Sequence, residues 1–367
     1  MRTDDDPHSP AWRSQALSGA RLPASCLRSA VALVGASLVV CGCYDHQVED
    51  LSIDPRLPID PQLMVDHVTE LASAKYGGRF PGTAGGALAL AQVESVFKTI
   101  GLAPAGDNQT YRQELDLETW QETSPAELLV SDRAMPTFNL LGAIRGIDSE
   151  HSQEHVLVGA HIDHLGTDPA SGAVFPGADD NASGIAVMSE LARQLAGSGI
   201  SLSRSILFVA FNAEEEGMLG SCHYVGHPLV PLEKTVAMLS VDMVGGGDGD
   251  GLALYGTTGS NRWLADLATI GADAHGLTGY RILPQAELLV SDHACFAEAG
   301  VPAVLATSLG PHAYRHTVED TAEHISSNDL ETSARLLWAL LRPLVLAQED
   351  TLLASDTGKR PAVRTHE

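Results

Sequence analysis

Residues 156–163, VLVGAHID, decide the fold class, because they form an unbroken apolar run that ends in a histidine and an aspartate. Runs of this length that are apolar throughout are typical of strands buried on both faces of a sheet. Further along, the acidic loop GADDNASG at 177–184 opens a run at 182–195 that has helical spacing. A strand, a loop and a helix in this order predict an α/β architecture.

The same alternation continues along the chain. Apolar spacing becomes helical from Leu63, and a second helix is predicted over residues 86–100, with Gly101 as its stop. Alternating strands and helices favour a three-layer αβα sandwich around a mixed, mostly parallel sheet, with ligands at the carboxyl ends of its strands. The predicted strands cover 111–119, 139–145, 156–163, 206–213, 236–243, 252–256 and 303–307, and the later helices 182–195, 218–225, 263–274, 294–299 and 329–347.

The charge balance excludes one class of partner. The 367 residues include 47 acidic and 22 basic side chains, for a formal net charge of -25. A nucleic-acid binder needs Lys and Arg to neutralise phosphates, so we expect no nucleic-acid partner. A composition that is 44% hydrophobic and 19% charged is globular. Most of the acids fit a solvated surface, and a few are expected to hold cations.

Residues 1–42 are predicted to be an export signal. An uncharged run at 29–41 follows three arginines and is too short to span a bilayer comfortably. The run ends in VCGC at 40–43, which resembles the lipobox of bacterial lipoproteins, and Cys43 would then be the acylated first residue. An ordinary cleaved signal or a misplaced start codon stays open. We therefore expect export, either as a membrane-anchored lipoprotein or as a secreted protein.

The rest of the chain is predicted to hold one catalytic domain at 62–353. Before it, residues 43–61 contain three prolines and five acids without periodicity, which favours a tether, and residues 354–367 are expected to be a disordered tail. Beyond the leader only Cys222 and Cys295 remain, and both a disulfide and two buried thiols fit them. No cysteine-rich zinc spacing exists, so any metal must be held by histidine and carboxylate.

Histidines and acids stand where the predicted strands end. Carboxyl ends of parallel strands meet at one edge of a sheet, so we expect these side chains to converge. Buried together without a cation, the carboxylates would repel one another and take up protons, so their convergence indicates a metal cluster. Each piece alone also fits a helix cap or a solvated turn, and the shared position is what favours a site. The residues are His161, Asp163, Asp179, Asp180, Glu214, Glu215, Glu216, Asp242 and His316.

The order of these segments resembles the two-zinc exopeptidases of the bacterial leucyl aminopeptidase and aminopeptidase Y kind, a family that includes glutamate carboxypeptidase II and the glutaminyl cyclases. The similarity covers nearly all of the mature chain and implies the zinc exopeptidase fold. It runs from GGRFPGTAGG at 77–86 through NLLGAIRG, GAHIDHLG, PGADDNASG, AFNAEEEGMLGS, SVDMVG and SDHACFAEAGVPA to HTVEDT.

Transferred to this chain, the resemblance implies two zinc ions that share one carboxylate. Two histidines and three carboxylates also suit zinc chemically. Relatives often have a cis peptide after the shared aspartate. The implied ligands are Asp180 as the bridge, His161 and Asp242 on one ion, and Glu215 and His316 on the other.

The resemblance also implies catalytic roles. Glu214 matches the family's general base, which takes a proton from the attacking water and returns it to the leaving amine. Asp163 matches a group that accepts a hydrogen bond from the ring of His161 and fixes its tautomer. Met243 stands where relatives line the pocket for the first side chain of the substrate, which hints at an apolar preference.

One departure concerns the oxyanion of the reaction. Relatives have a tyrosine directly before the final histidine, whereas this chain has Arg315 there and Tyr314 one step earlier, although His312 still matches the family pattern. Either Tyr314 or Arg315 is a hypothesis for the group that stabilises the oxyanion. The remaining neighbours are assigned by position alone: His164 and His293 as structural, and Ser291 and Asp292 as supports of the site.

The resulting hypothesis is a zinc aminopeptidase that removes N-terminal residues, large apolar ones above all, from peptides with a free amine. A glutaminyl cyclase with one zinc, a carboxypeptidase and a non-catalytic peptide-binding lipoprotein are the alternatives. The unbroken ligand set and Glu214 favour the aminopeptidase, and no arginine-rich pocket marks a carboxypeptidase. Contact with a membrane is expected only through a lipid on Cys43.

Overall fold

The computed structural model describes residues 59–115, 135–246, 251–256, 261–274, 276–283 and 291–346. The predictions for the leader at 1–42, for residues 43–58 of the tether and for the tail at 354–367 lie outside these ranges. Among the described helices, none is both long enough and apolar enough to cross a bilayer.

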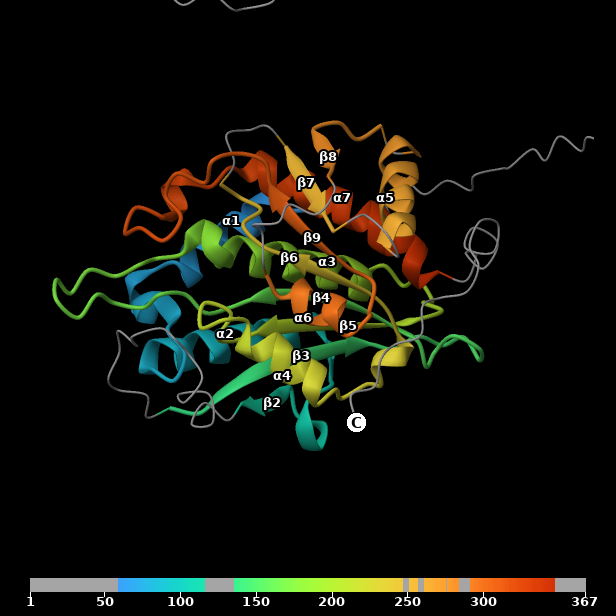
Figure 1. Cartoon of the computed structure of the whole chain (residues 1–367), viewed down its shortest axis with the longest axis horizontal. Helices are drawn as coiled ribbons and strands as arrows, with labels where there is room; N and C mark the ends of the chain where they lie inside the picture. Colours follow the sequence, from blue (N-terminus) through green and yellow to red (C-terminus); the bar gives the residue numbers. More distant parts are fainter. Residues whose placement is uncertain are drawn as a thin grey trace, which may run out of the picture. The chain divides into compact units, whose positions relative to one another are not determined.

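A mixed sheet of nine strands forms the middle layer of the described domain (Figure 1). Its four central strands, β5, β4, β6 and β9, are parallel, while β3 pairs antiparallel with β5 and β7 pairs antiparallel with β9. The order is β1-β3-β5-β4-β6-β9-β7-β8, and β2 pairs with β3. The strands are β1 Ala103–Pro104, β2 Arg112–Leu115, β3 Thr137–Ile144, β4 His155–His161, β5 Ser205–Phe211, β6 Thr235–Val241, β7 Leu252–Tyr255, β8 Tyr280–Ile282 and β9 Ala303–Ser308.

Helices cover both faces of the sheet, which confirms the predicted αβα sandwich. Helices α1, α2, α3 and α7 lie on one face, with α5 packed on α7, and α4 and α6 lie in front of the other face (Figure 1). The helices are α1 Pro61–Leu71, α2 Ala84–Ile100, α3 Gly184–Gly197, α4 Leu219–Gly226, α5 Arg262–Ala274, α6 His293–Glu298 and α7 Ser327–Val345, with shorter turns η1 Ala74–Arg79, η2 Asp107–Gln109, η3 Ala178–Ser183, η4 Leu232–Lys234 and η6 Ala322–His324.

The central strands are apolar throughout because both of their faces are buried. On β4, Val156 and Val158 pack in the larger hydrophobic cluster, whereas Leu157 between them packs in the smaller cluster on the other face. On β5, Phe208 and Val209 divide in the same way. Alternate residues of one strand thus supply two cores, which fixes the register and holds the strand ends rigidly.

Local signals set the helix boundaries close to the predicted ones. The Thr83 hydroxyl accepts a hydrogen bond from the Gly86 amide at 3.1 Å and starts α2, which ends at Gly101 in a left-handed conformation (φ 87°). The short strands β1 and β8 were not predicted, because two or three residues are too few to show a period. Of the predicted strand at 111–119, residues 112–115 form β2, and residues 116–119 lie outside the described ranges.

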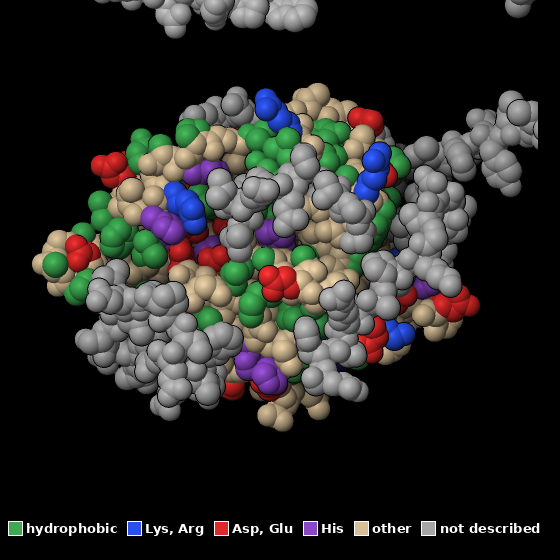
Figure 2. Space-filling model, viewed as in Figure 1, with side chains coloured by type: hydrophobic (Ala, Val, Ile, Leu, Met, Phe, Trp, Pro, Cys, Tyr) green, Lys and Arg blue, Asp and Glu red, His purple; other side chains and the backbone are tan. Residues whose placement is uncertain are grey.

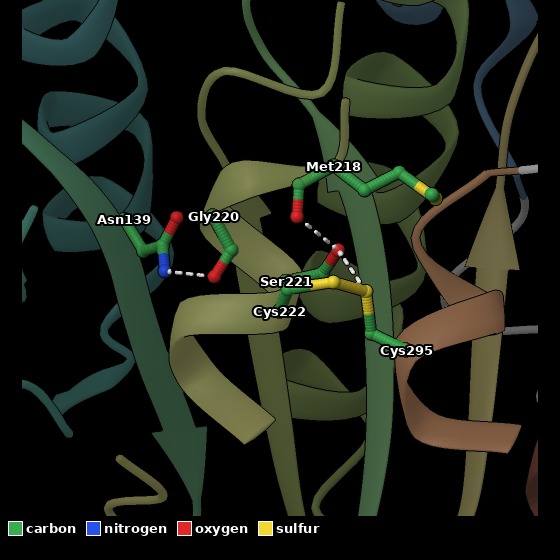
Figure 3. Close-up of a disulfide and its surroundings, with 6 residues drawn as sticks. All are labelled: Asn139, Met218, Gly220, Ser221, Cys222 and Cys295. Carbon is green, nitrogen blue, oxygen red and sulfur yellow. Dashed lines mark hydrogen bonds between the residues drawn. A yellow bond between two sulfur atoms is a disulfide. The ribbon is translucent and has the colours of Figure 1, made fainter. Parts of the chain in front are cut away.

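The two cysteines left open by the sequence form a disulfide. Cys222 on α4 and Cys295 on α6 are bonded, so the bridge joins the two helices of the smaller core (Figure 3). Next to it, the Ser221 hydroxyl donates to the Met218 carbonyl at 3.2 Å and lies 3.8 Å from the Cys295 sulfur. The bridge closes a loop with a sequence separation of 73 residues.

Candidate metal centre

The first ligand group lies where β4 and β6 end. His161 is the last residue of β4, and Asp242 directly follows β6. The Nε2 atom of His161 lies 3.2 Å from Asp180 Oδ1 and 3.3 Å from Asp242 Oδ1. All three side chains are nearly buried, and their ligand atoms are close enough to bind one ion.

The second group lies on the other side of Asp180. His316 Nε2 is 3.2 Å from Asp180 Oδ2 and 3.1 Å from Glu215 Oε2. The other oxygen of Glu215 lies 2.8 Å from Nδ1 of His164, and His164, Asp180 and Glu215 also form a group that could hold an ion. Asp180 therefore presents one oxygen to each group.

The donors fit a divalent cation. Oδ2 of Asp180 is buried, and no donor among the described residues meets hydrogen-bond geometry with it, although His316 Nε2 lies 3.2 Å away and Arg315 Nε 3.5 Å away. A buried carboxylate oxygen without a well-directed donor is suited to bind a cation. Burial acts to raise the pKa of Asp180, but the histidines His161 and His316 outweigh it, and its pKa lies well below the usual value. The pKa of Glu215 falls to about 2, because His164 and His316 outweigh both burial and the charge of Asp180. Charged carboxylates together with imidazole nitrogens are a donor set that suits zinc.

Glu214 differs from its neighbour Glu215. Its side chain is 12% exposed, and its Oε2 lies 4.0 Å from His161 Nε2, outside both ligand groups. Burial raises its pKa well above the usual value. A carboxyl group at the rim of the cluster that holds a proton more readily than its neighbours is suited to proton transfer.

Asp163 orients this glutamate pair through the main chain. Its two carboxylate oxygens accept hydrogen bonds from the Glu214 amide at 3.0 Å and the Glu215 amide at 3.1 Å. The contact implied with the His161 ring is looser: Nδ1 is 3.8 Å from the Asp163 carboxylate and 3.3 Å from its carbonyl oxygen. Burial raises the pKa of Asp163 to about 6.

The two oxyanion candidates lie in different places. Arg315 Nε is 3.5 Å from Asp180 Oδ2, at the site. The Tyr314 ring instead stacks on His324, with ring centroids 3.9 Å apart. Met243 follows the ligand Asp242 and is only 8% exposed.

The other positions singled out in the sequence also lie around the cluster. The peptide bond between Asp180 and Asn181 is cis, as the resemblance implied. His312 Nδ1 lies 2.7 Å from Asp179 Oδ2, which ties the loop after β9 to the loop that carries Asp180. Asp292 is fully buried, and this burial raises its pKa to about 7, whereas burial lowers the pKa of His293 to about 4. Ser291 Oγ lies 3.3 Å from Ser240 Oγ on β6.

Sequence reasoning missed three residues that contact this cluster. His164 was expected to be structural, yet its buried ring lies against Glu215. Arg79 and Asp320 had no predicted role, although both lie in motifs singled out above, and both bind the main chain of the loop that carries Asp180.

On the face shown in Figure 2, histidine and acidic side chains gather left of the centre, next to a lysine or arginine side chain.

Comparison with known proteins finds aminopeptidases among the similar sequences. The chain is 32% identical over 209 residues to "Aminopeptidase YwaD" of Bacillus subtilis, covering 55% of this chain and 43% of that protein. It is 28% identical over 228 residues to "Leucine aminopeptidase 1" of Aspergillus niger, covering 58% of this chain and 56% of that protein. The chain thus spans about half the length of the curated relatives that it matches.

Solved structures share the fold. "BSAP, a zinc aminopeptidase from Bacillus subtilis" aligns with a TM-score of 0.61 at 22% identity, over 80% of this chain and 97% of that one. A glutaminyl cyclase from Porphyromonas gingivalis aligns with a TM-score of 0.61 at 23% identity, over 78% of this chain and 99% of that one. Residues 139–341, more than half of the chain, match the family model "Peptidase family M28". The chain therefore belongs to peptidase family M28.

Proposed function

We propose that this chain is an aminopeptidase that holds two zinc ions and removes N-terminal residues, large apolar ones above all, from peptides with a free amine. The observation that carries the proposal is the position of Asp180, whose two carboxylate oxygens face separate groups of metal-binding side chains. Two sites that share one carboxylate are the arrangement that a pair of cations needs.

The chain offers a complete set of ligands for this role. His161 and Asp242 would hold one ion together with Asp180, and Glu215 and His316 would hold the other. His164 would then orient Glu215 through its 2.8 Å contact, since a carboxylate ligand is commonly fixed by a second partner. Bound zinc supplies a Lewis acid that polarises a carbonyl oxygen and makes water a better nucleophile near neutral pH.

Glu214 is the proposed general base. It would accept a proton from the attacking water and pass it to the departing amine, so that water adds across the peptide bond and an amino acid and a shortened peptide are released. The Asp163 carboxylate accepts hydrogen bonds from the Glu214 and Glu215 amides and so holds this turn in place, which limits the directions that the Glu214 carboxylate can take. Four positive charges from two zinc ions would favour the ionised form of Glu214 that a base requires.

The substrate would be recognised by its amine and its first side chain. A free ammonium group is attracted to the excess of carboxylates, whereas a blocked amine has no charge to offer. Met243 is proposed to line the pocket for an apolar side chain. Arg315, whose Nε lies near Asp180, is proposed to stabilise the oxyanion in place of the tyrosine found in relatives.

The experiment that tests this function compares leucyl-p-nitroanilide with its N-acetylated form. We expect hydrolysis of the free amine only, loss of activity after chelation, and recovery when zinc is added back. Hydrolysis that a chelator leaves unchanged would contradict the proposal. Cyclisation of a glutaminyl peptide without hydrolysis would favour the cyclase, and two bound zincs without any turnover would favour a binding protein.

We also propose that the protein is exported and anchored by a lipid on Cys43. The basic and then apolar order of residues 1–42 and the VCGC segment support this. Mass spectrometry of the mature N-terminus should find an acylated cysteine. Cleavage at another residue, or a free thiol on Cys43, would contradict it.

A further inference from the structure

Arg79 has no part in the mechanism above, yet its side chain reaches the metal centre. It ends η1, within the motif GGRFPGTAGG, and is 1% exposed. The guanidinium donates five hydrogen bonds, and every acceptor is a main-chain carbonyl. The acceptors are Leu71 at 3.0 Å, Ile162 at 2.8 Å, Pro176 at 2.6 Å, Gly177 at 2.8 Å and Asp180 at 3.3 Å.

These carbonyls belong to three separate segments. Leu71 ends α1, and Ile162 lies between His161 and Asp163, in the turn after β4. Gly177 and Asp180 lie in the loop that carries the shared carboxylate. One side chain therefore connects the turn after β4 to the Asp180 loop, and it does so in the interior, where unpaired carbonyls would cost stability.

The positive charge of Arg79 interacts with several carboxylates of the cluster rather than with one partner. Within the described ranges it forms no ion pair, and the carboxylates that act most strongly on its charge are those of Asp320, Asp180, Asp163 and Glu215. Burial lowers the pKa of Arg79 to about 10, so the guanidinium remains charged at neutral pH. A fixed buried cation thus offsets part of the repulsion among these carboxylates, whether or not an ion is bound.

The glycines of the GGRFPGTAGG motif allow the backbone next to Arg79 to pack closely on its neighbours. Gly78 has a left-handed conformation (φ 71°), and a Cβ there would collide with the backbone of Gly166. A Cβ on Gly85 would collide in the same way with the carbonyl of Tyr76. The backbone around Arg79 is packed directly on the strand-end loops, which is the close approach that only glycine permits.

Asp320 binds the same loop through the loop's N–H groups. Its carboxylate accepts hydrogen bonds from the Asp179 amide at 2.9 Å and the Asp180 amide at 3.1 Å. The main chain of Asp180 is thus fixed at its N–H by Asp320 and at its carbonyl by Arg79. Rotation of the peptide units on either side of the shared ligand is blocked at both ends.

We propose that Arg79 is a positioning residue of the metal centre: its five-bond fork holds the Asp180 loop at a fixed distance from the turn that follows His161. The inference rests on the proposed function, because it concerns the ligands of that site. Arg79 contacts no substrate and no ligand side chain, and it acts on the ligands through their backbone.

The test compares R79K with R204K. Arg204 is also a buried arginine, 2% exposed, but it lies before β5 at the other end of the strands, bonded to Glu154 and to the Leu344 carbonyl. Zinc affinity of the metal-free, folded proteins would be measured by competition with a chromogenic chelator. R79K should bind zinc about 10- to 100-fold more weakly than the wild type, the cost typical of removing an outer partner of a ligand. R204K should lose thermal stability and keep its zinc affinity.

Lysine retains the positive charge but carries a compact ammonium group with three donors. R79K therefore removes the planar guanidinium with its five donors and keeps the cation. Wild-type zinc affinity in R79K would overturn the inference, as would an equal loss of affinity in R204K. Should R79K not fold, R79Q provides the same measurement with the same expected direction. A wild-type protein that bound no zinc would instead overturn the proposed function, so the two failures are distinguishable.

Discussion

Among the described residues, each end of the central strands buries one arginine, and the charge has different partners at the two ends. At the amino ends, Arg204 precedes β5 and bonds to Glu154, which precedes β4, at 2.7 Å. At the carboxyl ends, the five hydrogen bonds of Arg79 described above all go to carbonyls, and the carboxylates of Asp320, Asp180, Asp163 and Glu215 act on its charge without pairing with it. At the amino edge the charge of Arg204 is balanced by Glu154, so this pair has a structural role. The carboxyl edge keeps an excess of negative charge, which a metal cluster would balance.

The largest effect should come from replacing Glu214 at the carboxyl edge, with a matched replacement of Glu154 at the amino edge as the control. We expect E214Q to lower kcat by about 10²- to 10⁴-fold, because the glutamine cannot accept a proton, while zinc content stays the same. The control E154Q should keep its kcat and lower the free energy of unfolding by about 2 kcal/mol, because Arg204 loses a charged partner. Steady-state kinetics would measure kcat, metal analysis the zinc content, and denaturant unfolding the free energy of unfolding. Loss of zinc from E214Q would mean that the roles of Glu214 and Glu215 are exchanged.

The disulfide tests whether the carboxyl edge depends on covalent support. The pair C222S/C295S should lower the free energy of unfolding by about 4 kcal/mol, as expected for a loop of this size. Both helices that it joins pack on the smaller core rather than on the ligands, so zinc affinity should not change. Denaturant unfolding of the holo protein and chelator competition measure the two quantities. A drop in zinc affinity would place the bridge among the supports of the site.

Zinc itself should stabilise the molecule through the carboxyl edge alone. At a free concentration about 100 times its Kd, zinc should add about 2.7 kcal/mol to the free energy of unfolding. Denaturant unfolding with and without zinc should find this increment in the wild type and in E154Q, and most of it should be missing in D180N. An increment that survived D180N would argue against the shared carboxylate.

The smallest effect concerns an ion pair away from both edges. Glu94 on α2 bonds to Lys98 at 2.6 Å and to Arg112 at 2.8 Å. Burial opposes its charge, but the two cations outweigh burial and lower its pKa below the ordinary value of 4.5 for a glutamate. Its contribution, up to about 1 kcal/mol, should therefore be complete above pH 4.5 and should shrink as the pH falls below that value. Comparing wild type with E94Q across this range by denaturation should find the difference closing at low pH, with the zinc increment unaffected at neutral pH.

The sequence predicted the fold because each central strand is apolar on both faces. It predicted that acidic and histidine side chains would converge because His161 ends β4, Asp242 directly follows β6 and Glu215 lies in the turn after β5. Two kinds of feature could not be read in this way. Arg79 and Asp320 act on backbone groups, and no sequence pattern reports where distant carbonyls and amides converge. The disulfide depends on α4 and α6 packing on the same face, which their separation along the chain does not show.

Crystals of the zinc-loaded protein, with anomalous scattering recorded at the zinc edge, would test the shared-carboxylate centre most directly. Two anomalous peaks on either side of Asp180 are predicted, one beside His161 and Asp242 and the other beside Glu215 and His316. A single peak, or a second peak held by His164 without His316, would contradict this arrangement.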